Sequence, residues 1–269
     1  MDKIIESIDN SSWGYQIGDN NIKIICYADD AVLLAENEDN LQRLLYRVTK
    51  TAERYNMEIS TEKTKSMTVS KDPVRCKLSI NNHIIEQVLN FKYLGVNITT
   101  SRDNESETCA QAGKAAAISG YLRDVIWKNK YMLIENKVRI YKTCIRPILT
   151  YAVETRADTS KTKQRLRTTE MQTLRQICNY SLRDKKRSSD IRNMCGVQDI
   201  VRWTRSRQRN WRDHVHRMNE NRLAKIENDW STNIKTTNRK TVEATEGVLD
   251  ITITRSDRKG LIGKTGNIA

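Results

Sequence analysis

The chain has 269 residues and a formal net charge of +14, because 47 lysines and arginines outnumber 33 aspartates and glutamates. This length suffices for one or two domains with a sizeable core, and so large a basic excess favours a polyanionic partner, most often nucleic acid. No apolar run approaches the roughly 20 residues that span a bilayer, and the six cysteines are scattered without a Cys-x-x-Cys pair. The sequence therefore predicts an intracellular protein, nuclear or cytoplasmic, without membrane association or a disulfide framework.

The first predicted element is a β-hairpin around the stretch "YADD". Residues 22–26 alternate in polarity, and residues 31–34 form a second short apolar run. Asp29 and Asp30 therefore fall at or beside the turn. Two adjacent carboxylates repel each other unless a cation lies between them, and Mg²⁺ takes such oxygen ligands. A solvent-exposed Asp-Asp turn is the simpler interpretation of the pair taken alone, because aspartate is common in turns.

A helix and several short strands are predicted to follow the hairpin. The helix begins after Asn37, and its apolar residues recur at helical spacing: Leu41, Leu44, Leu45, Val48, Ala52 and Tyr55. Short strands run from there to residue 99, with Asn81 and Asn82 as a tight turn and "FKYLGVNIT" as the last strand. Strands on both sides of a helix predict an α+β fold, with an antiparallel sheet and helices packed on one face.

From about residue 104 the pattern is helical and becomes strongly basic. Pro147 lies inside the second helical pattern and is expected to kink or break it. Residues 161–225 contain 18 lysines and arginines but only 6 aspartates and glutamates. A long helix is predicted to begin near Asp199, and on it Trp203 and Trp211 are expected to face the core.

Four arginines of this last helix recur at intervals of three or four residues and so share one face: Arg202, Arg205, Arg209 and Arg212. Such a face could follow the phosphates of a nucleic acid. The simpler alternative is a solvated charged surface.

Several motifs, in the order of the chain, resemble one protein family. "YADD" between two apolar strands resembles the C motif of reverse transcriptases, "MEISTEKTKSM" resembles their D motif, and "FKYLGVNIT" resembles the primer grip. "IRPILTYAVET" and "WRDHVHRM" resemble the helical C-terminal region of non-LTR retrotransposon polymerases of the insect endonuclease–reverse transcriptase kind. The resemblance extends from about residue 1 to residue 225.

This resemblance implies RNA-directed DNA synthesis by two-metal nucleotidyl transfer. It makes Asp29 and Asp30 catalytic ligands of Mg²⁺, or of Mn²⁺, and Lys63 a candidate proton donor beside the incoming nucleotide, with Lys65 as the alternative. It also implies an RNA template and a DNA primer or target DNA as partners. The primer grip would consist of Phe91, Lys92, Tyr93, Leu94 and Gly95.

The family's A motif, with a further aspartate, and its glycine-containing B motif are not recognisable in the sequence. The resemblance therefore implies a partial palm at residues 1–100, a thumb-like helical region at 101–158 and a basic helical extension at 159–227. Residues 228–269 are predicted to be a largely disordered tail. Such a chain is expected to be inactive alone and to bind Mg²⁺ weakly, unless another polypeptide supplies the missing motifs.

A different class of function fits the same helices. A helix, a turn, the short helix "SDIRNMCG", another turn and a long basic helix could form a helix-turn-helix module that reads duplex DNA. The chain would then be a non-catalytic nucleic-acid-binding protein. Sequence-specific binding would favour that module, and uniform binding to any nucleic acid would favour the polymerase interpretation.

Overall fold

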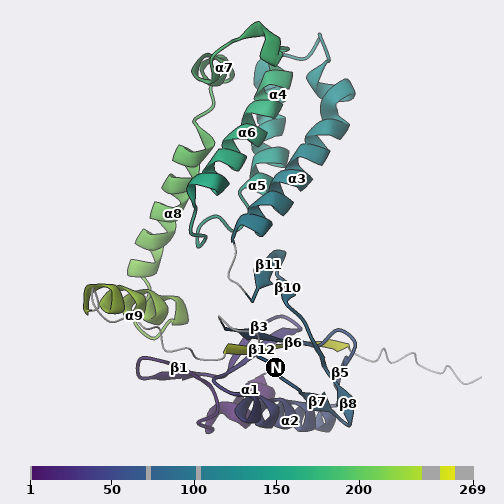
Figure 1. Cartoon of the computed structure of the whole chain (residues 1–269), viewed down its shortest axis with the longest axis vertical. Helices are drawn as coiled ribbons and strands as arrows, with labels where there is room; N and C mark the ends of the chain where they lie inside the picture. The colour runs from purple at the N-terminus through teal and green to yellow at the C-terminus, as the bar shows by residue number, and fades with distance from the viewer. Residues whose placement is uncertain (1, 71–73, 101–103, 238–248, 258–269) are drawn as a thin grey trace, which may run out of the picture. The chain divides into compact units, whose positions relative to one another are not determined.

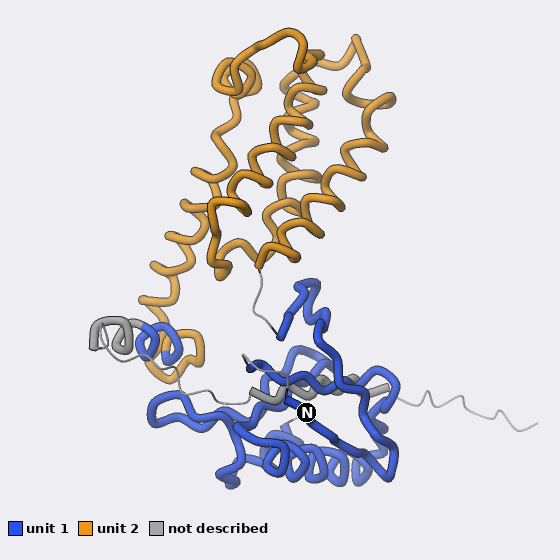
Figure 2. Tube along the Cα trace, in the orientation of Figure 1, with its two compact units in different colours: residues 1–102, 226–269 blue, residues 103–225 orange. Residues whose placement is uncertain are grey.

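The computed structural model describes residues 2–70, 74–100, 104–237 and 249–257, which form two compact units. The first unit comprises residues 1–102 and 226–269, and the second comprises residues 103–225 (Figure 2). Strands and helices share the first unit, and the second is helical (Figure 1). The predicted mixture of helix and sheet is thus confirmed. Within the described ranges, no helix combines the length and the apolarity needed to cross a membrane.

The first unit is organised around a sheet of six strands. They are β3 (Ile24–Tyr27), β4 (Asp30–Ala35), β5 (Glu58–Ile59), β6 (Lys65–Val69), β9 (Glu86–Gln87) and β12 (Leu249–Asp257). They pair in the order β3-β4-β12-β6-β9, and β5 pairs with the end of β12. β12 is antiparallel to both β4 and β6, whereas β9 is parallel to β6. A central position in the sheet is therefore filled by a segment that follows the whole helical unit in the sequence.

Two helices, α1 (Asp2–Asp9) and α2 (Glu38–Arg54), cover one face of this sheet. The Asn37 side chain accepts a hydrogen bond from the backbone N–H of Asn40 and caps α2 as expected. Five of the six predicted apolar positions of α2 are buried, but Tyr55 lies just past the helix and is exposed. The helix contributes Leu41, Leu44, Leu45, Val48 and Ala52 to a core shared with Leu33 and Ala35 of β4.

Hairpins cover the other face. Their strands are β1 (Tyr15–Ile17) with β2 (Asn20–Ile22), and β10 (Asn90–Tyr93) with β11 (Val96–Thr99). Val32, Leu34, Met67 and Val69 of the sheet form a second core, against which Tyr15, Ile22, Phe91, Tyr93 and Ile98 of these hairpins pack. A third hairpin, β7 (Ser79–Ile80) with β8 (His83–Ile84), turns at Asn81 and Asn82, which both have positive φ.

The prediction that "FKYLGVNIT" forms one strand is wrong. The segment folds back on itself at Leu94 and Gly95, whose φ angles are +47° and +83°. Two successive residues with positive φ make the kind of two-residue turn that matches the twist of a hairpin. Glycine reaches this conformation without steric cost, so Gly95 ends the strand instead of continuing it.

The expected disordered tail also differs from the structure. Residues 223–237 form the helix α9 (Leu223–Thr237), and residues 249–257 form β12. The remaining parts of the predicted tail, residues 238–248 and 258–269, lie outside the described residues. The sequence "LDITITRSD" alternates aspartate or threonine with leucine or isoleucine, a strand pattern that the polar composition of the segment obscured.

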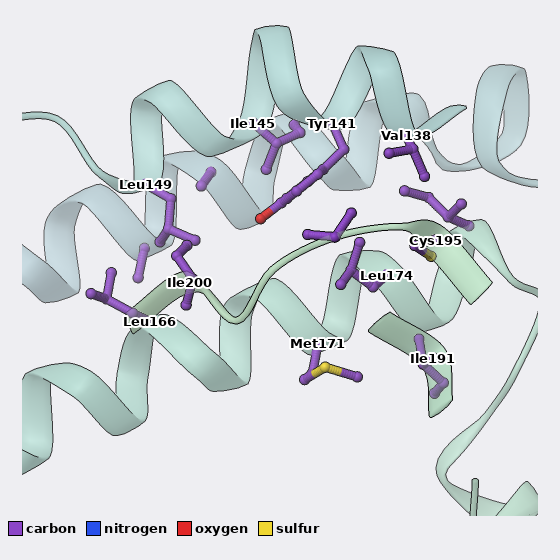
Figure 3. Close-up of a cluster of buried hydrophobic side chains, with 14 of the residues drawn as sticks. Val138, Tyr141, Ile145, Leu149, Leu166, Met171, Leu174, Ile191, Cys195 and Ile200 are labelled. Atoms are coloured by element: carbon purple, nitrogen blue, oxygen red, sulfur yellow. The ribbon is translucent and has the colours of Figure 1, made fainter. Parts of the chain in front are cut away.

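The second unit is a helical bundle with one core. Its helices are α3 (Asn104–Leu122), α4 (Ile134–Ile140), α5 (Arg146–Leu149), α6 (Ser160–Ile177), α7 (Ser188–Cys195) and α8 (Ile200–His216). Figure 3 shows this core, to which residues from α4 to α8 contribute. The two helical regions separated in the sequence analysis, 101–158 and 159–227, thus share one set of buried side chains. Pro147 lies in the first turn of α5, and a π-helical segment, Tyr141–Ile145, separates this helix from α4, so the α-helical pattern is interrupted before the proline as expected.

A buried carboxylate links four segments of this bundle. Glu170 of α6 is fully buried, and its carboxylate accepts hydrogen bonds from the Arg192 guanidinium at 2.8 and 3.0 Å. It also accepts one from the Tyr141 hydroxyl at 3.2 Å and one from the backbone N–H of Ile200 at 3.3 Å. Burial raises the pKa of Glu170, and the hydrogen bonds and charge of Arg192 oppose that effect. The cluster fixes α7 and the start of α8 against α6.

Two thiols of this unit are placed to react with each other. The Sγ atoms of Cys178 and Cys195 lie 3.2 Å apart, and a hydrogen bond from Cys195 lowers the pKa of Cys178 to about 7. We expect hydrogen peroxide to join them, with both thiol hydrogens leaving in water as the peroxide is reduced. The bond would close a loop of 17 residues and stabilise the unit by about 3 kcal/mol.

Mass spectrometry of peptides and thermal unfolding of the oxidised protein test this expectation. The Cys195→Ser variant is the control, because it removes the partner and leaves Cys178 in place. Oxidation that links other cysteines first, or leaves the 178–195 pair reduced, would contradict the expected pairing.

Candidate catalytic hairpin and nucleic-acid interface

Asp29 and Asp30 lie at a tight turn. Tyr27 of β3 pairs with Asp30 of β4, so Ala28 and Asp29 are the two turn residues. Ala28 has a φ of +51°, a conformation that costs a residue with a side chain about 1–2 kcal/mol. Asp29 is exposed and Asp30 is half-buried, while the five following residues of β4 are all buried. A buried strand therefore holds the carboxylate pair at the solvent boundary.

The sheet brings Asp30 and Lys63 to the same end. Val32 of β4 and Lys65 of β6 both pair with Ile253 of β12. The strands β4 and β6 run in the same direction, because each is antiparallel to β12. Asp30 and Lys63 each precede the paired position by two residues, so both lie where these strands begin.

The two candidate lysines differ in their surroundings. Lys63 is exposed in the turn formed by residues 61–63. The Lys65 ammonium lies 2.6 Å from the carboxylate of Glu86 and is partly buried. Both lysines thus lie near the start of β6, and the ion pair of Lys65 with Glu86 distinguishes their described surroundings.

The predicted primer-grip segment, residues 91–95, lies near the "YADD" hairpin. Burial raises the pKa of Tyr93, and the negative charge of Asp30 adds to this effect. Among the described residues no group forms a hydrogen bond with the buried Tyr93 hydroxyl. Phe91, Tyr93 and Gly95 are half-buried, whereas Lys92 and Leu94 are exposed. The structure thus brings one member of the segment, Tyr93, within electrostatic reach of Asp30.

No larger carboxylate cluster surrounds the pair in the part of the chain that the structure describes. There, no group of three or more histidine, cysteine, aspartate or glutamate side chains is close enough to hold a metal ion. Glu36 follows β4 at the opposite end from Asp30, and its carboxylate accepts a hydrogen bond from the backbone N–H of Gln16. The donor set at the turn is therefore Asp29 and Asp30.

The arginines of α8 form an exposed face in the second unit. Asp199 caps the helix by accepting hydrogen bonds from the backbone N–H groups of Val201 and Arg202. The described residues provide no ion-pair partner for the four predicted arginines, all of them exposed: Arg202, Arg205, Arg209 and Arg212. Arg207, on the same helix, is by contrast 3.0 Å from the Glu154 carboxylate.

The first three of these arginines line a hollow of about 640 Å³. Arg167 of α6 also lines it, together with Asp199, whose carboxylate is 3.2 Å from the Arg167 guanidinium. Arg212 lies outside the hollow, further along the helix. Sequence spacing along α8 could not reveal Arg167, since only packing brings α6 beside α8.

The prediction that Trp203 and Trp211 face the core is wrong. Both are only partly buried, and neither belongs to the core of the unit. The Arg146 and Arg207 guanidinium groups lie 4.7 and 5.8 Å from the Trp203 ring centroid, as in cation–π contacts. The buried stripe of α8 consists of Ile200, Val201, Thr204 and Val215. Trp203 lies at the edge of this stripe and is covered by arginines.

The first 98 residues, which include the "YADD" hairpin, are similar to known proteins. Residues 1–98 match the family model of reverse transcriptase (RNA-dependent DNA polymerase). An uncharacterized transposon-derived protein of Caenorhabditis elegans is 24% identical over 226 residues, which cover 80% of this chain and 79% of the worm protein.

The RNA-directed DNA polymerase from the mobile element jockey of Drosophila funebris is 27% identical over 170 residues. This alignment covers 60% of the chain but only 18% of the jockey protein. With the family model over residues 1–98, these relatives confirm the resemblance of this chain to the reverse transcriptases of non-LTR retrotransposons.

Proposed function

We propose that this chain is part of a retrotransposon reverse transcriptase that holds nucleic acid but does not synthesise DNA by itself. The observation that carries the proposal is the Asp29–Asp30 pair at the turn of a buried hairpin, within the residues that match the reverse transcriptase model. The match over residues 1–98 supports a palm-like role for the first unit, and a thumb-like role for the second is proposed from the resemblance of its motifs alone. The parent reaction is RNA-templated DNA synthesis.

Asp29 and Asp30 would hold Mg²⁺ through their carboxylates. A pair of such ions stabilises the attacking and leaving oxygens in nucleotidyl transfer. Lys63, at the same end of the sheet, would place a positive charge or a proton beside the departing phosphate. Phe91 to Gly95 would support the primer, with Tyr93 within electrostatic reach of Asp30.

We expect the chain to bind Mg²⁺ only weakly. The turn offers two carboxylates, and Mg²⁺ held by so few protein ligands keeps most of its water. Isothermal titration with MgCl₂ is expected to give no stoichiometric site at micromolar metal. The Asp29→Asn/Asp30→Asn variant is the control for nonspecific binding. A tight site lost in this variant would mean that another ligand, such as Glu58, completes the coordination.

A polypeptide of residues 1–269 is also expected not to extend a primer. Two carboxylates alone leave the cations under-coordinated, and positioning of reactants can contribute about 7–11 kcal/mol to catalysis. The assay uses a DNA primer on an RNA template with all four nucleotides and Mg²⁺ or Mn²⁺. Extension that disappears in Asp29→Ala would show that the chain is a complete catalyst.

The helical unit is proposed to hold the template–primer or target DNA through phosphates. Four exposed arginines without ion pairs among the described residues, three of them around one hollow, support this role. Phosphate contacts position a protein on nucleic acid and carry no base information. Binding should therefore depend strongly on salt and weakly on sequence.

One feature favours the second candidate, a helix-turn-helix reader of duplex DNA. Four residues, Gly196 to Asp199, connect α7 to α8, and Gly196 ends α7 with a φ of +57°. A short turn with glycine is typical of helix-turn-helix modules. Such a module would bind some duplexes orders of magnitude more tightly than others. Fluorescence anisotropy on unrelated duplexes and one RNA–DNA hybrid separates the two functions.

A further inference from the structure

The sheet of the first unit depends on β12 for its continuity. β4 pairs with β3 along one edge and with β12 along the other. β6 pairs with β12 over five residues but with β9 only at Lys65 and Ser66. In the described sheet, β4 and β6 do not pair with each other. Without β12, the sheet would contain a slot one strand wide.

The walls of this slot are buried. Residues 31–35 of β4 and residues 66–69 of β6 are all buried, under α2 on one face and under the hairpins on the other. A buried backbone N–H or C=O group without a partner costs about 1–3 kcal/mol. Because β12 pairs with six residues of β4 and five of β6, several such groups face the slot. An extended strand is the ligand that satisfies them.

We propose that the slot between β4 and β6 is a strand-binding site, and that the chain's own residues 249–257 are its exchangeable occupant. The segment has alternating isoleucine and threonine, which suits a strand with neighbours on both sides. It enters the sheet after the entire helical unit, antiparallel to both walls, as added strands do in β-augmentation.

The occupant also determines the geometry of the candidate site. Asp30 begins one wall of the slot, and Lys63 precedes the other. Adjacent strands are about 4.8 Å apart, so one intervening strand keeps the two walls about 10 Å apart. Exchange of this strand requires only the sheet and does not depend on DNA synthesis by the chain.

The test uses the full chain with a protease recognition sequence placed within residues 238–248. After folding and cleavage, the C-terminal fragment is expected to co-elute with the rest of the chain in native buffer and to separate in urea. A fluorescent peptide of residues 246–260 is then expected to replace the fragment, as measured by anisotropy. Uncut chain should bind this peptide at least tenfold more weakly, because its tethered strand occupies the slot.

Two peptides provide matched controls. Thr252→Pro removes the N–H of the residue that pairs with both Leu33 and Ser66, so this peptide should compete at least tenfold less well. Lys259→Pro lies beyond Asp257, where the described strand β12 ends, and should compete like the unchanged peptide.

Four results would overturn the proposal. A fragment that separates in native buffer would show that 249–257 is not held in the slot. Equal competition by the Thr252→Pro and unchanged peptides would exclude binding through the backbone ladder. A bound fragment that the fluorescent peptide never replaces would show that residues 249–257 are a permanent strand of the sheet. A dimer of uncut chains that dissociates only when the strand peptide is added would assign the strand to a second copy.

Discussion

Replacing Glu170 by alanine is expected to lower the free energy of unfolding of the helical unit by about 3–5 kcal/mol. The Glu170 carboxylate is fully buried, and its removal takes away the oxygen that accepts two N–H groups of the mostly buried Arg192 guanidinium, which keeps Asp199 at 3.1 Å as an ion-pair partner. The Tyr141 hydroxyl and the backbone N–H of Ile200 lose an acceptor as well. Removing one partner of a buried ion pair lowers the free energy of unfolding far more than losing a surface ion pair. Urea unfolding followed by circular dichroism measures the loss.

The control is Asp213→Ala on α8, which removes an exposed carboxylate from the same unit and should change stability by no more than about 0.5 kcal/mol. The Glu170→Ala/Arg192→Ala double variant should lose less than the sum of the two single variants, because neither charge is then left alone. If Glu170→Ala cost less than about 1 kcal/mol, the carboxylate would not be the buried link between α6, α7 and α8.

Replacing Arg205 and Arg209 by alanine is expected to weaken nucleic-acid binding and to reduce its dependence on salt. Each phosphate contact contributes about −0.9 to the slope of log K against log salt on duplex DNA, so four arginines give roughly −3 to −5. Losing two contacts should flatten this slope by about two units. Between 50 and 200 mM salt, the loss of affinity should then shrink from roughly 150-fold to roughly 12-fold.

The matched control is Lys3→Ala/Lys50→Ala, which removes two exposed positive charges from the first unit, each paired with a glutamate of its own helix. This variant should keep the original slope. The arginine substitutions should weaken all sequences alike, because phosphate contacts do not read bases. A collapse of preference for one duplex would instead support the helix-turn-helix reader, and a flat salt response of the unchanged protein would leave the arginines as a solvated surface.

Features with local causes were predictable from the sequence. The hairpin at "YADD", the cap of α2 at Asn37 and the start of α8 at Asp199 depend on neighbouring residues alone. The periodicity of α2 identified its buried face for the same reason, since helical spacing fixes which side chains share a side. The arginine face of α8 followed from spacing too, although its partner in the hollow, Arg167, did not.

The errors all involve contacts between distant residues. Trp203 has an apolar ring, but its packing against Arg146 of α5 decides its burial. The hairpin of "FKYLGVNIT" combines a local turn at Leu94 and Gly95 with the packing of Phe91 and Tyr93 on the sheet core. Local sequence preferences are too weak to fix the conformation and burial of such segments, and tertiary packing decides both.

The sequence by itself determined the groups that make up the candidate sites: adjacent carboxylates at a turn, a basic helix, and a family resemblance carried by motifs in series. Only the tertiary structure decided which segments complete the sheet and the bundle. Residues 249–257 read as a polar tail, yet they pair with β4 and β6. Glu170 reads as one acid among many bases, yet it is the buried acceptor of three segments. The reason is that buried backbone and polar groups must find hydrogen-bond partners, and these partners come from segments that are distant in the sequence.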